Sequence, residues 1–254
     1  MKNGVGHMIK AIFFDWGDTL SDSSVFLPDA ARSVFELIRP DVPGEELDSL
    51  WRRTWEGIGW ERLNGLSPQM AGEKVVREFC AGISTAFSLG SEEEGLARMS
   101  RAFLRGIAES ESLFPDVIPT LSHLSSAGYR LGIISNNMVE FVGPCLDHLG
   151  IRRYFDQVVV SGELGVGKPS PEIFAYALDR MRLKASEAAM VGDSPDADVA
   201  GAAGAGMRAV WVRRNGRTLC PEVRPDYVVR QIGELERLSS QWSMDGLTAR
   251  TESW

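Results

Sequence analysis

Short apolar runs alternate with stretches of helical pattern in the second half of the chain, and this alternation constrains the fold more than any other feature. The apolar runs lie at residues 130–134, 158–160, 188–191, 209–212 and 227–229, and helical patterns lie at 117–127, 139–149, 171–181 and 197–203. Strands that alternate with helices form right-handed βαβ units, which pair in parallel. The sequence therefore predicts an α/β fold with a parallel sheet, in which Ile9–Phe14 is the first strand.

Residues 22–112 have a different pattern, which predicts a helical domain inserted after the first strand. Pro28 and Pro43 each open a helical stretch, and Ser67-Pro68 and Ser91-Glu92-Glu93-Glu94 are typical helix starts. About 90 residues without a convincing strand are too many for a plain loop. The predicted domains are a core of residues 8–21 and 113–241, a helical cap of residues 22–112 and a C-terminal tail of residues 242–254.

Composition and charge exclude several classes of function. The 254 residues are 44% hydrophobic, which is enough for a sizeable core, and the net charge of −8 argues against a nucleic-acid-binding surface. No apolar run approaches the ~18 residues of a membrane span, and the N-terminus lacks the apolar segment of a secretory signal. We expect a cytoplasmic protein, a monomer or homodimer, with neither nucleic acid nor membrane as partner. Residues 1–7 are left outside the expected fold.

The cysteines and histidines show no spacing typical of a metal site (Cys80, Cys145 and Cys220; His7, His123 and His148). Any metal must therefore have oxygen ligands, and such ligands favour Mg²⁺ over Zn²⁺.

Four polar residues stand close to the predicted carboxyl ends of strands or just before a helix: Asp15, Ser135, Lys168 and Asp193. Each alone has an ordinary structural interpretation, because aspartate and serine cap helices and form turns, and lysine is usually a solvated surface residue. In a parallel α/β sheet, however, ligands bind beyond the carboxyl ends of the strands. The four positions together predict one convergent site.

These residues lie in segments that resemble the four motifs of the haloacid dehalogenase-like (HAD) superfamily of hydrolases. The segments are, in order, Phe13-Phe14-Asp15-Trp16-Gly17-Asp18-Thr19-Leu20, Ile133-Ile134-Ser135-Asn136, Gly167-Lys168-Pro169, and Val191-Gly192-Asp193-Ser194 with Asp198 beyond it. The helical insert resembles the C1-type cap of that superfamily, and the resemblance extends from Ile9 to Ser239. It implies a Rossmann-like core with a C1 cap after the first strand.

The resemblance also implies catalytic roles. Asp15 would be a nucleophile that attacks phosphorus and forms an aspartyl-phosphate. Ser135, Asn136 and nearby backbone N–H groups would bind the phosphoryl oxygens, and Lys168 would add a positive charge beside them and beside Asp15. The implied activity is hydrolysis of a small phosphorylated metabolite.

A Mg²⁺ ion is the cofactor that the resemblance implies. Asp15, the carbonyl group of Gly17 and Asp193 would hold the ion, and Asp198 would support this metal site without binding the ion itself. A cation is required because a carboxylate that attacks a phosphate dianion must overcome charge repulsion.

One position departs from the pattern of the superfamily's phosphatases. They carry a second aspartate two residues after the nucleophile, which protonates the leaving oxygen and then activates water, whereas this chain has Gly17 there. Asp18, Asp22 or a cap carboxylate such as Glu56 could take over as the acid/base, and the sequence does not choose among them.

This departure leaves three alternatives open. The 2-haloacid dehalogenases also lack the second aspartate and act on carbon without metal, but they lose the carboxylate that is kept here as Asp193. Phosphonoacetaldehyde hydrolases need a cap lysine, and Lys74, the only one here, does not stand where that family would place it. The third alternative is a catalytically weakened regulatory or binding member of the superfamily.

Overall fold

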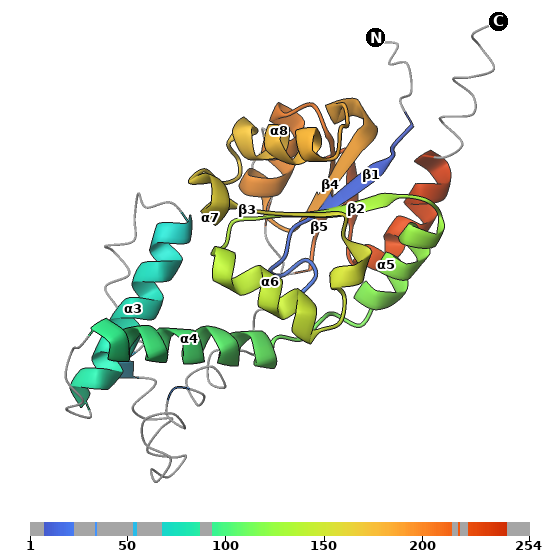
Figure 1. The fold of residues 1–254 in the computed structure, drawn as a ribbon. Helices are drawn as coiled ribbons and strands as arrows, with labels where there is room; N and C mark the ends of the chain where they lie inside the picture. Colours follow the sequence, from blue (N-terminus) through green and yellow to red (C-terminus); the bar gives the residue numbers. More distant parts are fainter. Residues whose placement is uncertain are drawn as a thin grey trace, which may run out of the picture.

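A six-stranded parallel sheet forms the centre of the computed structural model, which describes residues 8–22, 34, 53–54, 68–86, 93–214, 218 and 223–242 (Figure 1). The strand order is β3-β2-β1-β4-β5-β6, and every neighbouring pair is parallel. The strands are β1 (Ala11–Phe14), β2 (Arg130–Ser135), β3 (Gln157–Val160), β4 (Ala188–Gly192), β5 (Arg208–Val212) and β6 (Tyr227–Val229). The predicted α/β fold is confirmed.

Helices cover both faces of this sheet (Figure 1). On one face lie α5 (Val117–Ser126) and α6 (Val139–His148), and on the other α8 (Pro171–Arg180). The central strand β1 is buried on both faces: Ala11 and Phe13 join one hydrophobic cluster, and Ile12 and Phe14 join the other. This two-sided burial explains why the strand is a continuous apolar run rather than an alternating one.

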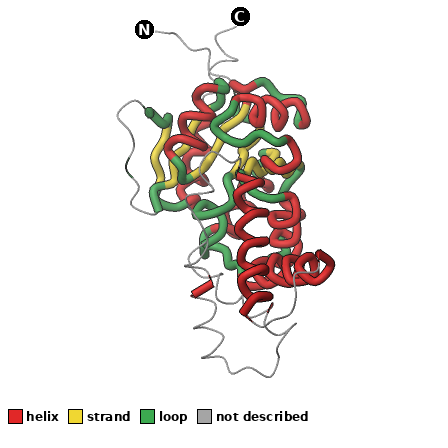
Figure 2. Tube along the Cα trace, turned by 90° about the vertical axis from the view of Figure 1, so that its left-hand side faces the viewer, coloured by secondary structure: helices red, strands yellow, loops and turns green. Residues whose placement is uncertain are grey.

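Helices α3 (Pro68–Ala86) and α4 (Glu93–Ser110) project from one end of the core (Figures 1 and 2). They pack against each other through Phe79 and Phe103, whose ring centroids are 4.7 Å apart, and α4 also contacts α6. These helices agree with the starts expected near Pro68 and Glu93. Most of the segment expected to form the two earlier cap helices, with Glu56, lies outside the described residues.

The fourth motif forms a wider turn than the predicted helix over 197–203. Residues Pro195–Ala200 (η4) are π-helical, and α9 covers only Gly201–Gly204. The carbonyl of Ser194 accepts hydrogen bonds from both Asp198 N, at 3.1 Å, and Val199 N, at 3.2 Å. A widened turn of this kind often occurs at functional sites. Here it includes Asp198, whose side chain is buried.

Several short elements complete the described chain. They are η2 (Arg152–Tyr154), α7 (Ser161–Leu164), η3 (Ala185–Glu187) and η5 (Ile232–Glu234), and residues 235–242 are helical. The expected tail begins with a buried side chain, because Trp242 is 1% exposed and packs edge-on against Tyr129 and Tyr227. Among the described residues, no helix has the length and apolar character needed to cross a membrane.

Candidate active site

The carboxyl edge of the sheet holds a polar cavity of about 240 Å³. All eight site residues predicted from the sequence line this cavity: Asp15, Gly17, Asp18, Ser135, Asn136, Lys168, Asp193 and Asp198. Three further residues that were not predicted as site residues also line it: Asn137, Ser194 and Ala197. Asp15 follows β1, Ser135 ends β2 and Asp193 follows β4, so parallel strands bring the first, second and fourth motifs to one edge. Asn137 directly follows Asn136, and Ser194 directly follows Asp193. These neighbouring positions in the sequence could have indicated that both residues line the cavity.

Lys168 lies at the centre of the charged groups. Its side chain is 2% exposed, and its Nζ lies 2.6 Å from Asp15 Oδ1 and 2.6 Å from Asp198 Oδ1. Burial by itself lowers the pKa of this ammonium group, but the charges and hydrogen bonds of the two carboxylates outweigh burial and leave the pKa above its ordinary value. Lys168 is therefore protonated at neutral pH, and it fixes the orientation of Asp15.

The main chain at Lys168 is held by Asn136. The Lys168 N–H donates to Asn136 Oδ1 at 2.7 Å, and Asn136 Nδ2 donates to the Lys168 carbonyl at 2.8 Å. This pair of bonds uses both ends of the side-chain amide. The side chain of Asn136 thus positions the main chain of Lys168.

Asp198 is completely enclosed by protein donors. Its Oδ1 accepts from Lys168, and its Oδ2 accepts from the Ser194 N–H at 2.9 Å. Burial raises the pKa of this carboxyl, and the Lys168 ammonium opposes the rise. The same packing explains Gly192, because a Cβ atom there would lie 2.2 Å from Asp198 Cγ. Only glycine fits so close to this side chain.

Three carboxylates converge on one point of the cavity. Oxygen atoms of Asp15, Asp193 and Asp198 lie within 4.8 Å of one another. An all-oxygen donor set of this kind suits a hard divalent cation such as Mg²⁺. Both oxygens of Asp198 accept hydrogen bonds from the protein, whereas Asp15 accepts one from Lys168 through Oδ1.

A tight turn at residues 16–21, which we call the flap loop, forms one side of the cavity. Leu20 N and Ser21 N donate to the Trp16 carbonyl at 2.9 and 3.0 Å, and Asp18 N donates to the Ser21 carbonyl at 2.8 Å. Asp18 adopts a left-handed conformation with φ of 57°, which is uncommon for a residue other than glycine. The turn places both Gly17 and Asp18 at the cavity.

The flap loop pairs with residues 111–116, the return segment that leads from α4 back to the core. Asp22 N donates to the Ser112 carbonyl at 2.9 Å, and Phe114 N donates to the Leu20 carbonyl at 3.1 Å. The two connections between the helical insert and the core therefore run side by side. The sequence does not predict this pairing, because its partners lie about 90 residues apart in the chain.

Glu111, the first residue of the return segment, is a buried carboxyl group beside the flap loop. It is 5% exposed. The pKa of this carboxyl is raised to about 7, mainly because burial disfavours its charged form. Interactions with Ser21 and Trp16 oppose the rise, and the charges of Asp18 and Asp22 add to it. The ionised form of Glu111 therefore destabilises the fold.

We expect Glu111→Gln to remove a pH-dependent loss of stability. A raised carboxyl pKa stabilises the fold fully below the unfolded value of 4.5, and that contribution is lost as the pH rises through about 7. The free energy of unfolding of the variant minus that of the wild type should increase by roughly 2–3 kcal/mol from pH 5 to pH 8. Urea unfolding at several pH values measures this difference. Glu109→Gln, on the exposed face of α4, is the control, and an equal pH trend in all three proteins would contradict the assignment.

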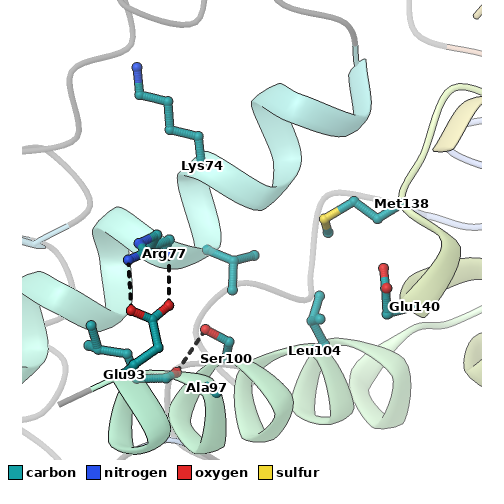
Figure 3. A pocket seen from close by; sticks show the side chains of 10 residues that line it. Lys74, Arg77, Glu93, Ala97, Ser100, Leu104, Met138 and Glu140 are labelled. Atoms are coloured by element: carbon teal, nitrogen blue, oxygen red, sulfur yellow. Dashed lines mark hydrogen bonds and ion pairs between the residues drawn. The ribbon is translucent and has the colours of Figure 1, made fainter. Parts of the chain in front are cut away.

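A second cavity of about 560 Å³ lies between α3, α4 and the start of α6 (Figure 3). Met138 and Leu104 line it, and Arg77 forms an ion pair with Glu93 at 3.3 Å on its wall. Lys74, the residue on which the phosphonoacetaldehyde hydrolase alternative depends, lines this second cavity. It is not among the described side chains that line the cavity around Asp15.

Comparison with known proteins agrees with the geometry. The family described as "Hydrolase: haloacid dehalogenase-like hydrolase" matches residues 9–206. The chain is 36% identical over 211 residues to a glyceraldehyde 3-phosphate phosphatase of Methanothermobacter thermautotrophicus, covering 81% of this chain and 86% of the relative. It is 34% identical over 189 residues to a phosphoserine phosphatase of Thermus thermophilus, covering 74% and 72%.

Among solved structures, the chain resembles a 2-haloacid dehalogenase from Pseudomonas syringae pv. Tomato DC3000. The TM-score is 0.70 and the identity is 28%, over 92% of this chain and all of that one. Relatives of this fold thus include both phosphatases and dehalogenases.

Proposed function

The chain belongs to the haloacid dehalogenase-like hydrolases, and from that premise we propose that it is a Mg²⁺-dependent phosphatase of a small phosphorylated metabolite. The observation that carries the proposal is the convergence of Asp15, Asp193 and Asp198 within 4.8 Å around one buried lysine. The names of two similar proteins, a glyceraldehyde 3-phosphate phosphatase and a phosphoserine phosphatase, support the substrate class. A cavity of about 240 Å³ suits a small substrate.

Asp15 would act as the nucleophile. One of its carboxylate oxygens attacks the phosphorus atom, the bond from phosphorus to the leaving oxygen breaks, and an aspartyl-phosphate forms. Water then attacks this phosphorus, releases inorganic phosphate and restores the carboxylate. The ion pair with Lys168 orients Asp15 before substrate binds.

The phosphoryl group would be held by positive charge and hydrogen-bond donors. Lys168 supplies the charge, and the Ser135 hydroxyl and the backbone N–H of Asn136 supply donors at the cavity. Asp198 would hold Lys168 in place rather than bind the substrate, because its two oxygens accept hydrogen bonds from Lys168 and Ser194. Its role is therefore to position the lysine.

A Mg²⁺ ion fits the donor set, and Asp15, the Gly17 carbonyl and Asp193 would hold it. When bound, the ion supplies positive charge that offsets repulsion between the carboxylate and the phosphate. Asp193 is 5% exposed, and its carbonyl accepts from Trp211 Nε1 at 2.9 Å, so its backbone is fixed in position.

Asp18 is the acid/base that the geometry favours. It lines the cavity, whereas Asp22 is not among the described residues that do so, and Glu56 lies outside the described residues. Asp18 would protonate the leaving oxygen and then take a proton from the attacking water.

A phosphate-release assay tests the proposed function. Phosphorylated three-carbon metabolites, with p-nitrophenyl phosphate as a generic probe, should release phosphate in the presence of Mg²⁺, and EDTA should abolish the release. Activity that EDTA does not change would contradict the metal assignment. If Asp18 is the acid, Asp18→Asn should slow alkyl phosphates by about 10²–10⁴-fold and p-nitrophenyl phosphate much less.

Dehalogenation is the second candidate, because a 2-haloacid dehalogenase shares the fold at a TM-score of 0.70. Halide release from 2-chloropropionate without added metal would support it. The retained carboxylate of Asp193 favours phosphorus chemistry, so we expect no halide release. Failure of both assays would favour a regulatory or binding member of the family.

A further inference from the structure

We propose that Arg214 is a positioning residue that clamps the flap loop and the return segment to the core. The inference rests on the proposed phosphatase function and adds to it the residue that holds Gly17 and Asp18 at the cavity. The Arg214 side chain contacts Thr19 in the flap loop, and it contacts Phe114 and Asp116 in the return segment.

The first part of the clamp is an ion pair with little exposure. Arg214 follows β5, its side chain is 11% exposed, and the side chain of Asp116 is 16% exposed. Arg214 Nη2 lies 2.8 Å from Asp116 Oδ1 and 3.0 Å from Asp116 Oδ2. Asp116 Oδ2 also accepts from the Gly233 N–H at 3.0 Å. The carboxylate therefore joins the return segment to two separate parts of the core.

The second part of the clamp reaches the flap loop. Arg214 Nη2 donates to the Thr19 carbonyl at 3.5 Å, and the guanidinium carbon lies 4.0 Å from the centre of the Phe114 ring. A guanidinium group at this distance from a ring face gains cation–π attraction. The backbone N–H of Phe114 donates to the Leu20 carbonyl, so the residue that carries this ring also pairs with the flap loop. Arg214 thus holds both connections to the insert at once.

The conformation of the flap loop explains why a clamp is needed. Asp18 has φ of 57°, a conformation that persists in a non-glycine residue only where surrounding contacts enforce it. Thr19, whose carbonyl faces Arg214, is the next residue and is fully buried. Loss of the clamp should let this turn relax, and the relaxation would displace the Gly17 carbonyl and the Asp18 carboxylate.

Arginine is specifically suited to this position. Its planar group stacks on Phe114 while the same nitrogen bonds Asp116 and Thr19, whereas a lysine ammonium restores the charge without the stacked plane. Arg214→Lys should therefore restore only part of what Arg214→Met loses.

The decisive experiment compares Arg214→Met with the wild type, using Arg213→Met as a matched control. Arg213 is the neighbouring exposed arginine, and it lies over the Trp211 ring at 5.8 Å instead of the flap loop. Amide hydrogen–deuterium exchange should become faster in residues 16–22 and 111–116 of Arg214→Met and stay unchanged in α8. With a phosphate monoester that the wild type hydrolyses, kcat should fall by about 10- to 100-fold and KM should change less.

Each outcome bears on a distinct claim. Unchanged exchange in the flap loop would overturn the clamp, and faster exchange with an unchanged kcat would overturn its role in positioning. If the wild type releases no phosphate from any substrate, the proposed function fails, and exchange still decides whether the clamp exists. Should Arg214→Met not fold, Asp116→Asn tests the same pair, because asparagine keeps the shape and weakens the charge.

Discussion

Asp15→Asn should lower phosphate release by at least about 10³-fold, because the amide oxygen is a far weaker nucleophile than the carboxylate. The change keeps the size of the side chain and an oxygen that Lys168 can reach. We therefore expect the variant to remain folded. Turnover of p-nitrophenyl phosphate measures the loss, and circular dichroism with urea unfolding checks the fold.

Asp147→Asn is the control for this variant, because Asp147 lies on the exposed side of α6, away from the cavity. It should retain full activity. Activity of Asp15→Asn within tenfold of the wild type, in folded protein, would exclude the aspartyl-phosphate route. Trapping a phosphorylated enzyme at Asp15 would support it directly.

Lys168→Met should abolish activity and also destabilise the fold by about 3–5 kcal/mol, because it leaves the buried Asp198 beside Asp15 without the cation between them. Urea unfolding measures the stability, and phosphate release measures the activity. The large cost arises from burial, since the Lys168 side chain is 2% exposed and that of Asp198 is 1% exposed.

An exposed ion pair of the same length provides the control. Lys10 Nζ also lies 2.6 Å from a carboxylate, Glu187 Oε1, but its side chain is 49% exposed. Lys10→Met should cost no more than about 1 kcal/mol. The double variant Lys168→Met/Asp198→Asn should recover part of the stability without recovering activity. Equal losses from Lys10→Met and Lys168→Met would contradict the role assigned to burial.

The motifs and the parallel sheet could be predicted because both depend on local sequence. A strand buried on both faces requires a continuous apolar run, as in Ala11–Phe14. Polar residues that end such runs at Asp15, Ser135 and Asp193 must then meet at one edge of a parallel sheet. The structure brings these three residues to one cavity together with the other predicted site residues.

Other features depend on partners far apart in the chain, and no local pattern specifies those partners. The side chain of Asn136, for example, holds the main chain of Lys168, 32 residues away. The local sequence does not specify the burial of Glu111, yet packing beside Trp16 and Ser21 removes this carboxyl from water and raises its pKa.

The sequence by itself determined which polar side chains follow the strands and at which edge of the sheet they meet, because strand burial and βαβ handedness follow from local pattern. Only the tertiary structure decided how these groups are held. Lys168 lies between two carboxylates 153 and 30 residues away, and Arg214 reaches Thr19 and Asp116 across 195 and 98 residues. Contacts of this kind are set by packing in three dimensions, which fixes distance, burial and hence charge state.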